Sequence, residues 1–151
     1  MSLENDIKQD RFIDSYHKLI LNVLYTASWV SYEQSILLKS YDLTLPQYNV
    51  LRILRGQYPS PVRINDIIER MLDKTSNASR LVDKLLLKQL AERTICPLDR
   101  RAVDVVITQK GLEILAELDE KQLNWHDANN NLSEEEATLM SNLLDKMRHS
   151  I

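Results

Sequence analysis

The chain has 151 residues, of which 44% are hydrophobic, so it is long and apolar enough to form one domain, 1–151, with its own core. Only two glycines and four prolines occur, which argues against an all-β fold and favours helices. The net charge is −3, which argues against a protein that coats nucleic acid over its whole surface. Residues 74–101, however, include seven basic and three acidic residues, so we expect one local anion-binding patch.

The chain lacks the residues that several classes of protein need. No apolar run reaches the roughly 20 residues of a membrane helix, and the first residues are acidic and polar, so we expect a cytoplasmic protein without membrane contact. The three histidines and Cys96 show no ligand spacing, and no glycine-rich phosphate loop occurs, so we expect no metal, no cofactor and no enzymatic activity. Cys96 is interpreted as a small buried residue rather than a redox sensor.

Three helices are predicted in the first half of the chain. Apolar residues at intervals of three and four, with no Gly or Pro, predict one long helix over 7–38. A second helix begins where Thr44 can cap it and Pro46 lies in its first turn, and it ends near Gly56. A short third helix follows from residue 64 or 65 to residue 72.

A fourth helix, which Thr75 or Ser76 can cap, has an apolar side and a polar, basic side. Its apolar stripe consists of Ala78, Leu81, Val82 and Leu85. Roughly opposite that stripe lie Ser76, Asn77, Arg80 and Lys84. This division suits a helix that packs on a core with one face and meets an anion with the other.

The periodicity then changes to two, which predicts a β-hairpin of strands 93–96 and 102–107 with a basic turn between them. Thr108 caps a fifth helix over 109–126, and the pair Ser133 and Glu136 forms a capping box that opens a last helix. The predicted fold is mostly α with a small β-hairpin wing. It comprises a winged helix-turn-helix over 43–108 between long terminal helices at 7–38 and 109–151.

Specific stretches of this segment resemble the MarR family of regulators. They are residues 43–51, 64–72 and 73–85, the run Asp99-Arg100-Arg101-Ala102-Val103 and the run Ile107-Thr108-Gln109-Lys110-Gly111. The resemblance covers about half the chain. It implies a homodimer that binds a pseudo-palindromic operator in double-stranded DNA, and a repressor relieved by a small aromatic or other organic effector. The alternative is a winged helix that binds proteins and not DNA.

The expected DNA contacts lie on the fourth helix and the wing: Lys74, Thr75, Ser76, Asn77, Ser79, Arg80, Lys84, Arg100 and Arg101. Amide and guanidinium groups can bind base edges, whereas lysines suit phosphates. The resemblance implies that Asp99 braces the wing and that a tip arginine enters the minor groove. The other interpretations are a solvated helix face, helix caps and an ordinary turn.

Two further features concern regulation and geometry. Tyr16, His17 and Tyr48 are candidates for an effector pocket, although core packing explains them equally well. After the fourth helix, which corresponds to the family's DNA-recognition helix, the family usually has a glycine in the left-handed conformation, and this chain has Gln89 there. If Gln89 adopts positive φ, we expect a cost of about 1 kcal/mol that the fold survives, and the sequence leaves the angle between helix and wing open.

Overall fold

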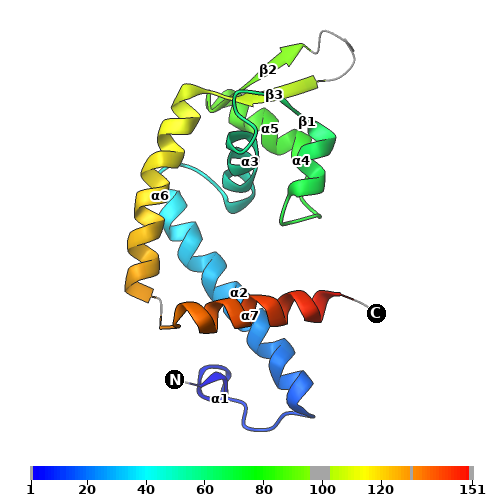
Figure 1. Ribbon diagram of the computed structural model, residues 1–151, viewed down its shortest axis with the longest axis vertical. Helices are drawn as coiled ribbons and strands as arrows, with labels where there is room; N and C mark the ends of the chain where they lie inside the picture. The colour runs from blue at the N-terminus through cyan, green and yellow to red at the C-terminus, as the bar shows by residue number, and fades with distance from the viewer. Residues whose placement is uncertain (1, 96–102, 130, 150–151) are drawn as a thin grey trace. The chain divides into compact units, whose positions relative to one another are not determined.

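The computed structural model describes residues 2–95, 103–129 and 131–149 (Figure 1). The chain divides into two compact units, residues 1–115 and 116–151, which are described separately. The elements in chain order are α1 (Leu3–Ile7), α2 (Ser15–Lys39), α3 (Leu45–Arg55), β1 (Val62–Arg63), α4 (Ile64–Arg70), α5 (Ala78–Leu87), β2 (Ala91–Ile95), β3 (Val103–Ile107), α6 (Gln109–Asn129) and α7 (Glu134–Arg148).

The N-terminal region contains two helices, so the prediction of one helix over 7–38 is wrong at its start. Helix α1 ends at Ile7 because Lys8 adopts the left-handed conformation, with φ of 52°. Helix α2 begins only at Ser15, where the Asp14 carboxylate accepts a hydrogen bond of 2.7 Å from the backbone N–H of His17. An aspartate cap satisfies an N–H group that a continuous helix would have bonded internally.

The next three helices form as the sequence predicts, with two corrections at their ends. Thr44 caps α3 through a capping box, in which its hydroxyl accepts from the Gln47 backbone at 3.4 Å and Gln47 Oε1 accepts from the Thr44 backbone at 3.2 Å. Helix α4 ends at Arg70, two residues early. The N-cap of α5 is Asn77, and not Thr75 or Ser76.

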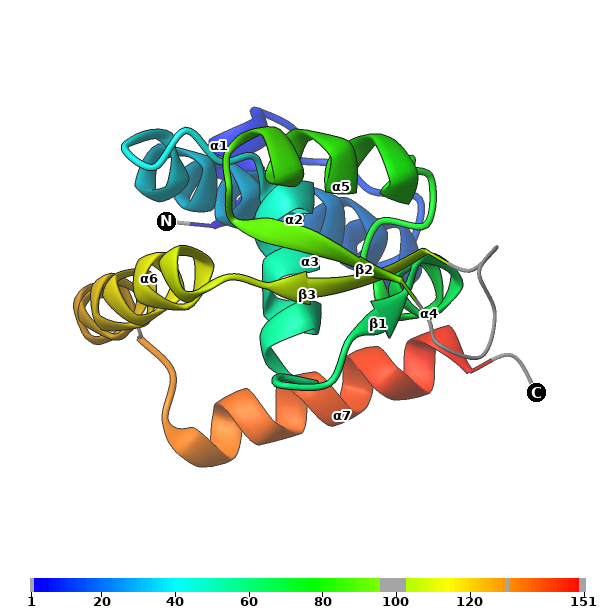
Figure 2. The same ribbon diagram turned by 90° about the horizontal axis from the view of Figure 1, so that it is seen from above.

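Strands β2 and β3 form the predicted antiparallel pair, although β2 begins at Ala91, two residues before its predicted start. A third strand that the sequence did not predict joins them. The sheet order is β1-β3-β2 and every pairing is antiparallel. Val62 of β1 pairs with Val105 of β3, which in turn pairs with Arg93 of β2. Figure 2 shows α3 behind these strands and α5 next to β2. Because α3 contacts both β3 and α5, it supports the hairpin and α5 together.

Apolar side chains from every long element of the first unit form its core. The buried hydrophobic residues between α2 and the start of α6 are Leu38, Leu43, Val50, Leu51, Leu54, Val62, Ile67, Met71, Ala78, Val82, Leu85, Leu90, Ala91, Val105, Ile107 and Leu115. Burial of this set stabilises the unit through removal of apolar surface from water. The same set holds α5 in place from behind.

The second unit contains most of α6 and all of α7. Helix α6 continues to Asn129, three residues beyond its predicted end. The predicted capping box opens α7: the Ser133 hydroxyl accepts from the Glu136 backbone at 3.2 Å, and the Glu136 carboxylate accepts from the Ser133 backbone at 2.8 Å. No residue of α7 is buried. Among the described residues, no helix combines the length and hydropathy that crossing a bilayer requires.

Candidate nucleic-acid interface

Helix α5 presents a polar, basic face to solvent and an apolar face to the core. Ala78, Val82 and Leu85 are at most 2% exposed, whereas Leu81 is half-buried. The side chains that lie on the other face, Ser79, Arg80, Asp83 and Lys84, are exposed. Since α5 packs on α3 and α4, its basic face is held in a fixed orientation. A helix of this kind has the width and the charge that the DNA major groove accepts.

The turn between α4 and α5 is organised by the carboxylate of Asp73. Its Oδ1 accepts from the backbone N–H of Thr75 at 2.9 Å and from the Thr75 hydroxyl at 2.6 Å, and its Oδ2 accepts from the Ser76 hydroxyl at 2.6 Å. The hydrogen bonds from Ser76 and Thr75 lower the pKa of Asp73 from 3.8 to about 2. Both hydroxyl protons are therefore engaged within the turn, so these two oxygens can form further hydrogen bonds only as acceptors.

Asn77 caps α5, which corrects the prediction that Thr75 or Ser76 does so. Its Oδ1 accepts a hydrogen bond of 3.0 Å from the backbone N–H of Arg80. Asp73 engages the two hydroxyls that would otherwise compete for this position. The Asn77 oxygen is thus used in the cap, and its amide NH₂ is the group that it can offer to a base edge.

Lys74 follows α4 in the turn before α5, and its side chain reaches back to the C-terminal end of α4. Its ammonium group donates to the carbonyl oxygens of Ile68, at 3.4 Å, and Glu69. These are carbonyls of the last helical turn, where a positive charge is favourable. An ammonium group has three protons. Two can bond the carbonyl oxygens at the helix end, and the third can still bond a phosphate.

Three residues that the sequence reasoning missed hold this region together. The Asn49 side chain on α3 accepts from the backbone N–H of Leu72 at 2.9 Å, which fixes the start of the turn. Arg93 of β2 forms an ion pair of 2.5 Å with Asp83 of α5. Asp73 could have been found, because an aspartate followed by Thr75 and Ser76 is typical of a side-chain-bonded turn. Asn49 and Arg93 show no comparable local signal.

In the connection from α5 to the wing, Gln89 adopts the left-handed conformation that the family's usual glycine would take. Gln89 has φ of 61°, and its carbonyl oxygen accepts a hydrogen bond of 2.8 Å from the Thr108 hydroxyl. Thr108 also caps α6, as predicted, through the backbone N–H of Gly111 at 3.2 Å. The wing residues Asp99, Arg100 and Arg101, as well as Cys96, lie outside the described residues.

The three effector candidates lie on two helices of the first unit. Tyr16 is 72% exposed near the start of α2, and the next residue, His17, accepts a hydrogen bond of 3.2 Å at Nδ1 from the backbone of Ile13. The Tyr48 hydroxyl on α3 accepts from the Arg52 guanidinium at 3.3 Å. None of the three lines the cavity of about 370 Å³ that opens at the C-terminal end of α5.

Comparisons with known proteins agree with this arrangement. Residues 41–102 match the sequence model of the MarR family. The chain is 29% identical to the HTH-type transcriptional regulator MgrA of Staphylococcus aureus over 119 residues. This alignment covers 79% of each protein. A crystal structure of a MarR transcription factor from Planctomyces limnophilus superposes with a TM-score of 0.68 and 27% identity, covering 91% of this chain and 98% of that one.

A further solved structure resembles the chain in fold. It is a mutant of S. aureus MepR bound to an oligodeoxyribonucleotide, with a TM-score of 0.58, 22% identity and coverage of 89% of this chain and 96% of that one. The matched residues 41–102 include the helix-turn-helix, and the structural likeness extends over most of the chain. Residues 41–102 therefore match the MarR family, and most of the chain is similar in sequence or fold to winged-helix transcriptional regulators of that family.

Proposed function

We propose that this protein is a homodimeric repressor that binds a pseudo-palindromic operator in double-stranded DNA and releases it when a small organic effector binds. The observation that carries the proposal is the division of α5 into a buried apolar face and an exposed face with Arg80 and Lys84. Two such helices, related by a two-fold axis, would enter successive major grooves about one helical turn apart. Occupation of a promoter would then block transcription in the cytoplasm.

Each residue that is predicted to contact DNA can be given a role that agrees with its surroundings. Arg80 reads base edges through its guanidinium fork, and Lys84 and Lys74 bind phosphates. Ser79 and the amide NH₂ of Asn77 are further donors, and the hydroxyls of the Asp73 turn act as acceptors. For Asp99, Arg100 and Arg101, the roles in the wing remain those that the family resemblance implies.

Exposed apolar side chains on α2 and α7 support the dimer, each helix being considered by itself. Those on α2 are Tyr16, Leu19, Ile20, Leu24, Tyr25, Trp29, Tyr32 and Ile36. Those on α7 are Leu139, Met140, Leu143 and Met147. Surfaces of this kind are rare on monomers, and a symmetric dimer is the commonest way to cover them. Tyr16, His17 and Tyr48 remain the candidates for the effector of this dimer.

Selection of bound fragments from random double-stranded DNA tests the proposal directly. We expect a pseudo-palindrome whose affinity falls steeply with salt, because lysines and arginines displace counterions from phosphates. Arg80→Ala should cost about 1–3 kcal/mol per half-site and relax preference at one symmetric pair of positions. Arg11→Ala, which removes an exposed arginine from the segment before α2, is the matched control and should leave preference unchanged.

The outcome that contradicts the proposal is equally specific. If the selection enriches no sequence and the protein binds DNA no better than Arg80→Ala does, the exposed face of α5 is not a DNA-reading surface. The winged helix would then serve as a protein-interaction module.

A further inference from the structure

Three side chains in the turn between α4 and α5 present lone pairs and no available proton. Asp73 and Thr75 are exposed, and Ser76 is half-buried. The Asp73 carboxylate is ionised at neutral pH, since its pKa is about 2, and an ionised carboxylate can only accept hydrogen bonds. The hydroxyls of Thr75 and Ser76 each lie 2.6 Å from one of its oxygens, so each hydroxyl donates its single proton to Asp73.

This hydrogen-bond polarity excludes the usual role of a hydroxyl group at a protein–DNA interface. Phosphate oxygens are acceptors, and serine or threonine binds them by donating a proton. Thr75 cannot donate to a phosphate while its proton is held by Asp73. The negative charge of Asp73 also repels a phosphate at this place. Thr75 therefore requires a hydrogen-bond donor on the DNA.

The donors that DNA offers in the major groove are exocyclic amino groups. Adenine donates through N6 and cytosine through N4, whereas guanine O6 and thymine O4 are acceptors. An oxygen that can only accept would face guanine or thymine with no proton between the two acceptors, and such a contact is unfavourable. An acceptor at the start of α5 thus distinguishes adenine and cytosine from guanine and thymine on the strand that it faces.

The next residues of the chain have the opposite polarity. Asn77 Oδ1 accepts from the backbone N–H of Arg80 at 3.0 Å, as the cap of α5. The usual pairing of asparagine with adenine needs this oxygen together with the amide NH₂, so it would remove the cap. The groups that remain on Asn77 and Arg80 are donors, which suit the acceptors of guanine and thymine. The turn and the helix therefore select different bases.

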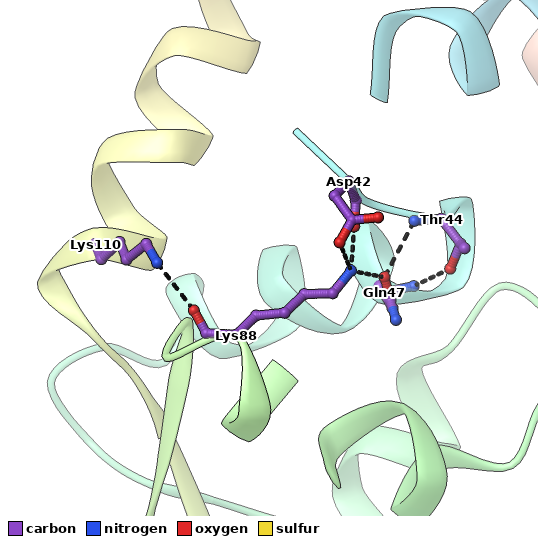
Figure 3. Close-up of polar contacts among 5 residues, drawn as sticks. All are labelled: Asp42, Thr44, Gln47, Lys88 and Lys110. Atoms are coloured by element: carbon purple, nitrogen blue, oxygen red, sulfur yellow. Dashed lines mark hydrogen bonds and ion pairs between the residues drawn. The ribbon is translucent and has the colours of Figure 1, made fainter. Parts of the chain in front are cut away.

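Helix α3 holds α5 at both ends, so the direction of these groups is set before DNA binds. Asn49 of α3 accepts from the backbone N–H of Leu72 at 2.9 Å, at the start of the turn. At the other end of α5, Lys88 Nζ donates to Gln47 Oε1 of α3 at 3.3 Å and lies 3.1 Å from Asp42 Oδ2 (Figure 3). A group that is already oriented loses little conformational entropy on binding.

We propose that Thr75 Oγ1 reads the exocyclic amino group of an adenine or a cytosine in the operator, and that Asp73 restricts it to this role by holding the hydroxyl proton. Thr75 is the reading residue because it is exposed. Asp73 is a positioning residue that acts through Thr75, and the half-buried Ser76 completes its hydrogen bonds. The inference rests on the proposed function, since it requires α5 to enter the major groove.

Selection of bound DNA fragments by three proteins tests this role of Thr75. The parent should prefer adenine or cytosine over guanine and thymine at one symmetric pair of positions. Thr75→Ser keeps the hydroxyl and should keep this preference. Thr75→Val has the same shape without the hydroxyl, so it should lose about threefold to tenfold discrimination per half-site, which is the effect of one hydrogen bond. Positions that depend on Arg80 should be unchanged in both variants.

An operator that lacks only the amino group tests the contact itself. Deoxynebularine replaces an enriched adenine, or 2-pyrimidinone deoxynucleoside replaces an enriched cytosine, at the position that Thr75→Val alters. The parent should bind this operator about threefold to tenfold more weakly than the natural one. Thr75→Val should show no such difference beyond the change in base pairing, which is common to both proteins and which an operator altered outside the half-sites measures.

Asp73→Asn tests the positioning role. An asparagine amide can donate to a hydroxyl, which releases the hydroxyl proton and allows Thr75 to donate as well as accept. The variant should discriminate less between amino and keto bases at the Thr75 position and keep the preference at the Arg80 positions. Circular dichroism checks its fold. Asp10→Asn, which makes the same change at an exposed aspartate before α2, is the matched control and should select the parental sequence.

The outcomes separate this inference from the proposed function. A parent that enriches no sequence would overturn both. A pseudo-palindrome that depends on Arg80 and is selected equally by Thr75→Val would overturn the role of Thr75 alone. Thr75→Val that weakens binding to all sequences equally would show a phosphate contact, and a parental preference for guanine or thymine at the altered position would show a donor. Either result would overturn the inference.

Discussion

The Thr108 hydroxyl donates a hydrogen bond of 2.8 Å to the carbonyl oxygen of Gln89, so the residue before α6 is bonded to the residue that reverses the chain after α5. Gln89 adopts φ of 61°, a conformation that favours glycine. Gln89→Gly should therefore raise the free energy of unfolding by about 0.5–1 kcal/mol. Urea denaturation measures this change. Gln89→Ala is the control, since alanine keeps the strain; a gain of the same size in both variants would show that strain is not its source.

Gly111, in the first turn of α6, has no room for a side chain. A Cβ there would lie 2.5 Å from the Leu90 carbonyl oxygen and 2.7 Å from Ile107 Cγ1. Gly111→Ala should cost about 1–3 kcal/mol of stability, because backbone and strand must shift to accept the methyl group. Thermal unfolding followed by circular dichroism measures it.

The second glycine supplies the matched control. At Gly56 the nearest atoms to an added Cβ are 3.5 Å away, and φ is −63°. Gly56→Ala should thus leave stability unchanged or raise it by about 0.4–1 kcal/mol. If both alanine variants lose the same stability, the crowding at Gly111 does not explain the loss.

The Asn77 cap predicts a stability effect that is independent of DNA. Asn77→Ala should cost about 1 kcal/mol, because the Arg80 N–H loses its acceptor at the start of α5. Asn77→Ser restores a capping oxygen and should recover most of that loss while it removes the amide NH₂. A serine variant with parental stability and weakened operator binding would separate capping from recognition. Equal stability of the alanine variant and the parent would show that this cap contributes nothing.

Asp73 makes the stability of the α4–α5 turn dependent on pH. Its folded pKa, about 2, lies below the ordinary value of 3.8 because Ser76 and Thr75 donate to the ionised form. This contribution to stability is complete above the unfolded pKa and is lost as the pH falls toward 2. NMR titration of the carboxyl carbon should show the low pKa. In Thr75→Ala combined with Ser76→Ala it should return toward 3.8, and an unchanged pKa there would contradict the assignment.

Local patterns predicted most of the helical framework. The cap at Thr44, the capping box at Ser133 and the apolar stripe of α5 depend on residues only three or four positions apart, and the structure confirms them. The break before α2 was missed because the segment contains no Gly or Pro, and Asp14 was not considered as a helix cap. The cap of α5 was assigned to the wrong residue because Asp73 competes for the hydroxyls of Thr75 and Ser76.

Contacts between distant residues could not be predicted in this way. Strand β1 has two residues, and its strand character arises from pairing with β3, which lies far along the chain. Lys88 was counted as part of a basic segment, but it binds the loop at Asp42 and the α3 residue Gln47. Charge alone does not distinguish a lysine that faces solvent from one that a carboxylate and an amide hold.

The dimer predicts that acidic substitutions on exposed apolar faces will change the oligomeric state. Leu24 on α2 is 61% exposed and Leu143 on α7 is 56% exposed, so each can become glutamate without disturbing the core of its own unit. In a dimer that buries these faces, an unpaired carboxylate is costly, and both variants should sediment as monomers. Leu72→Glu is the control, because Leu72 is 87% exposed in the turn after α4 and should leave the dimer intact. A monomeric parent, or dimers in both variants at micromolar concentration, would contradict the proposed assembly. A dimer lost in only one variant would assign the interface to that helix alone.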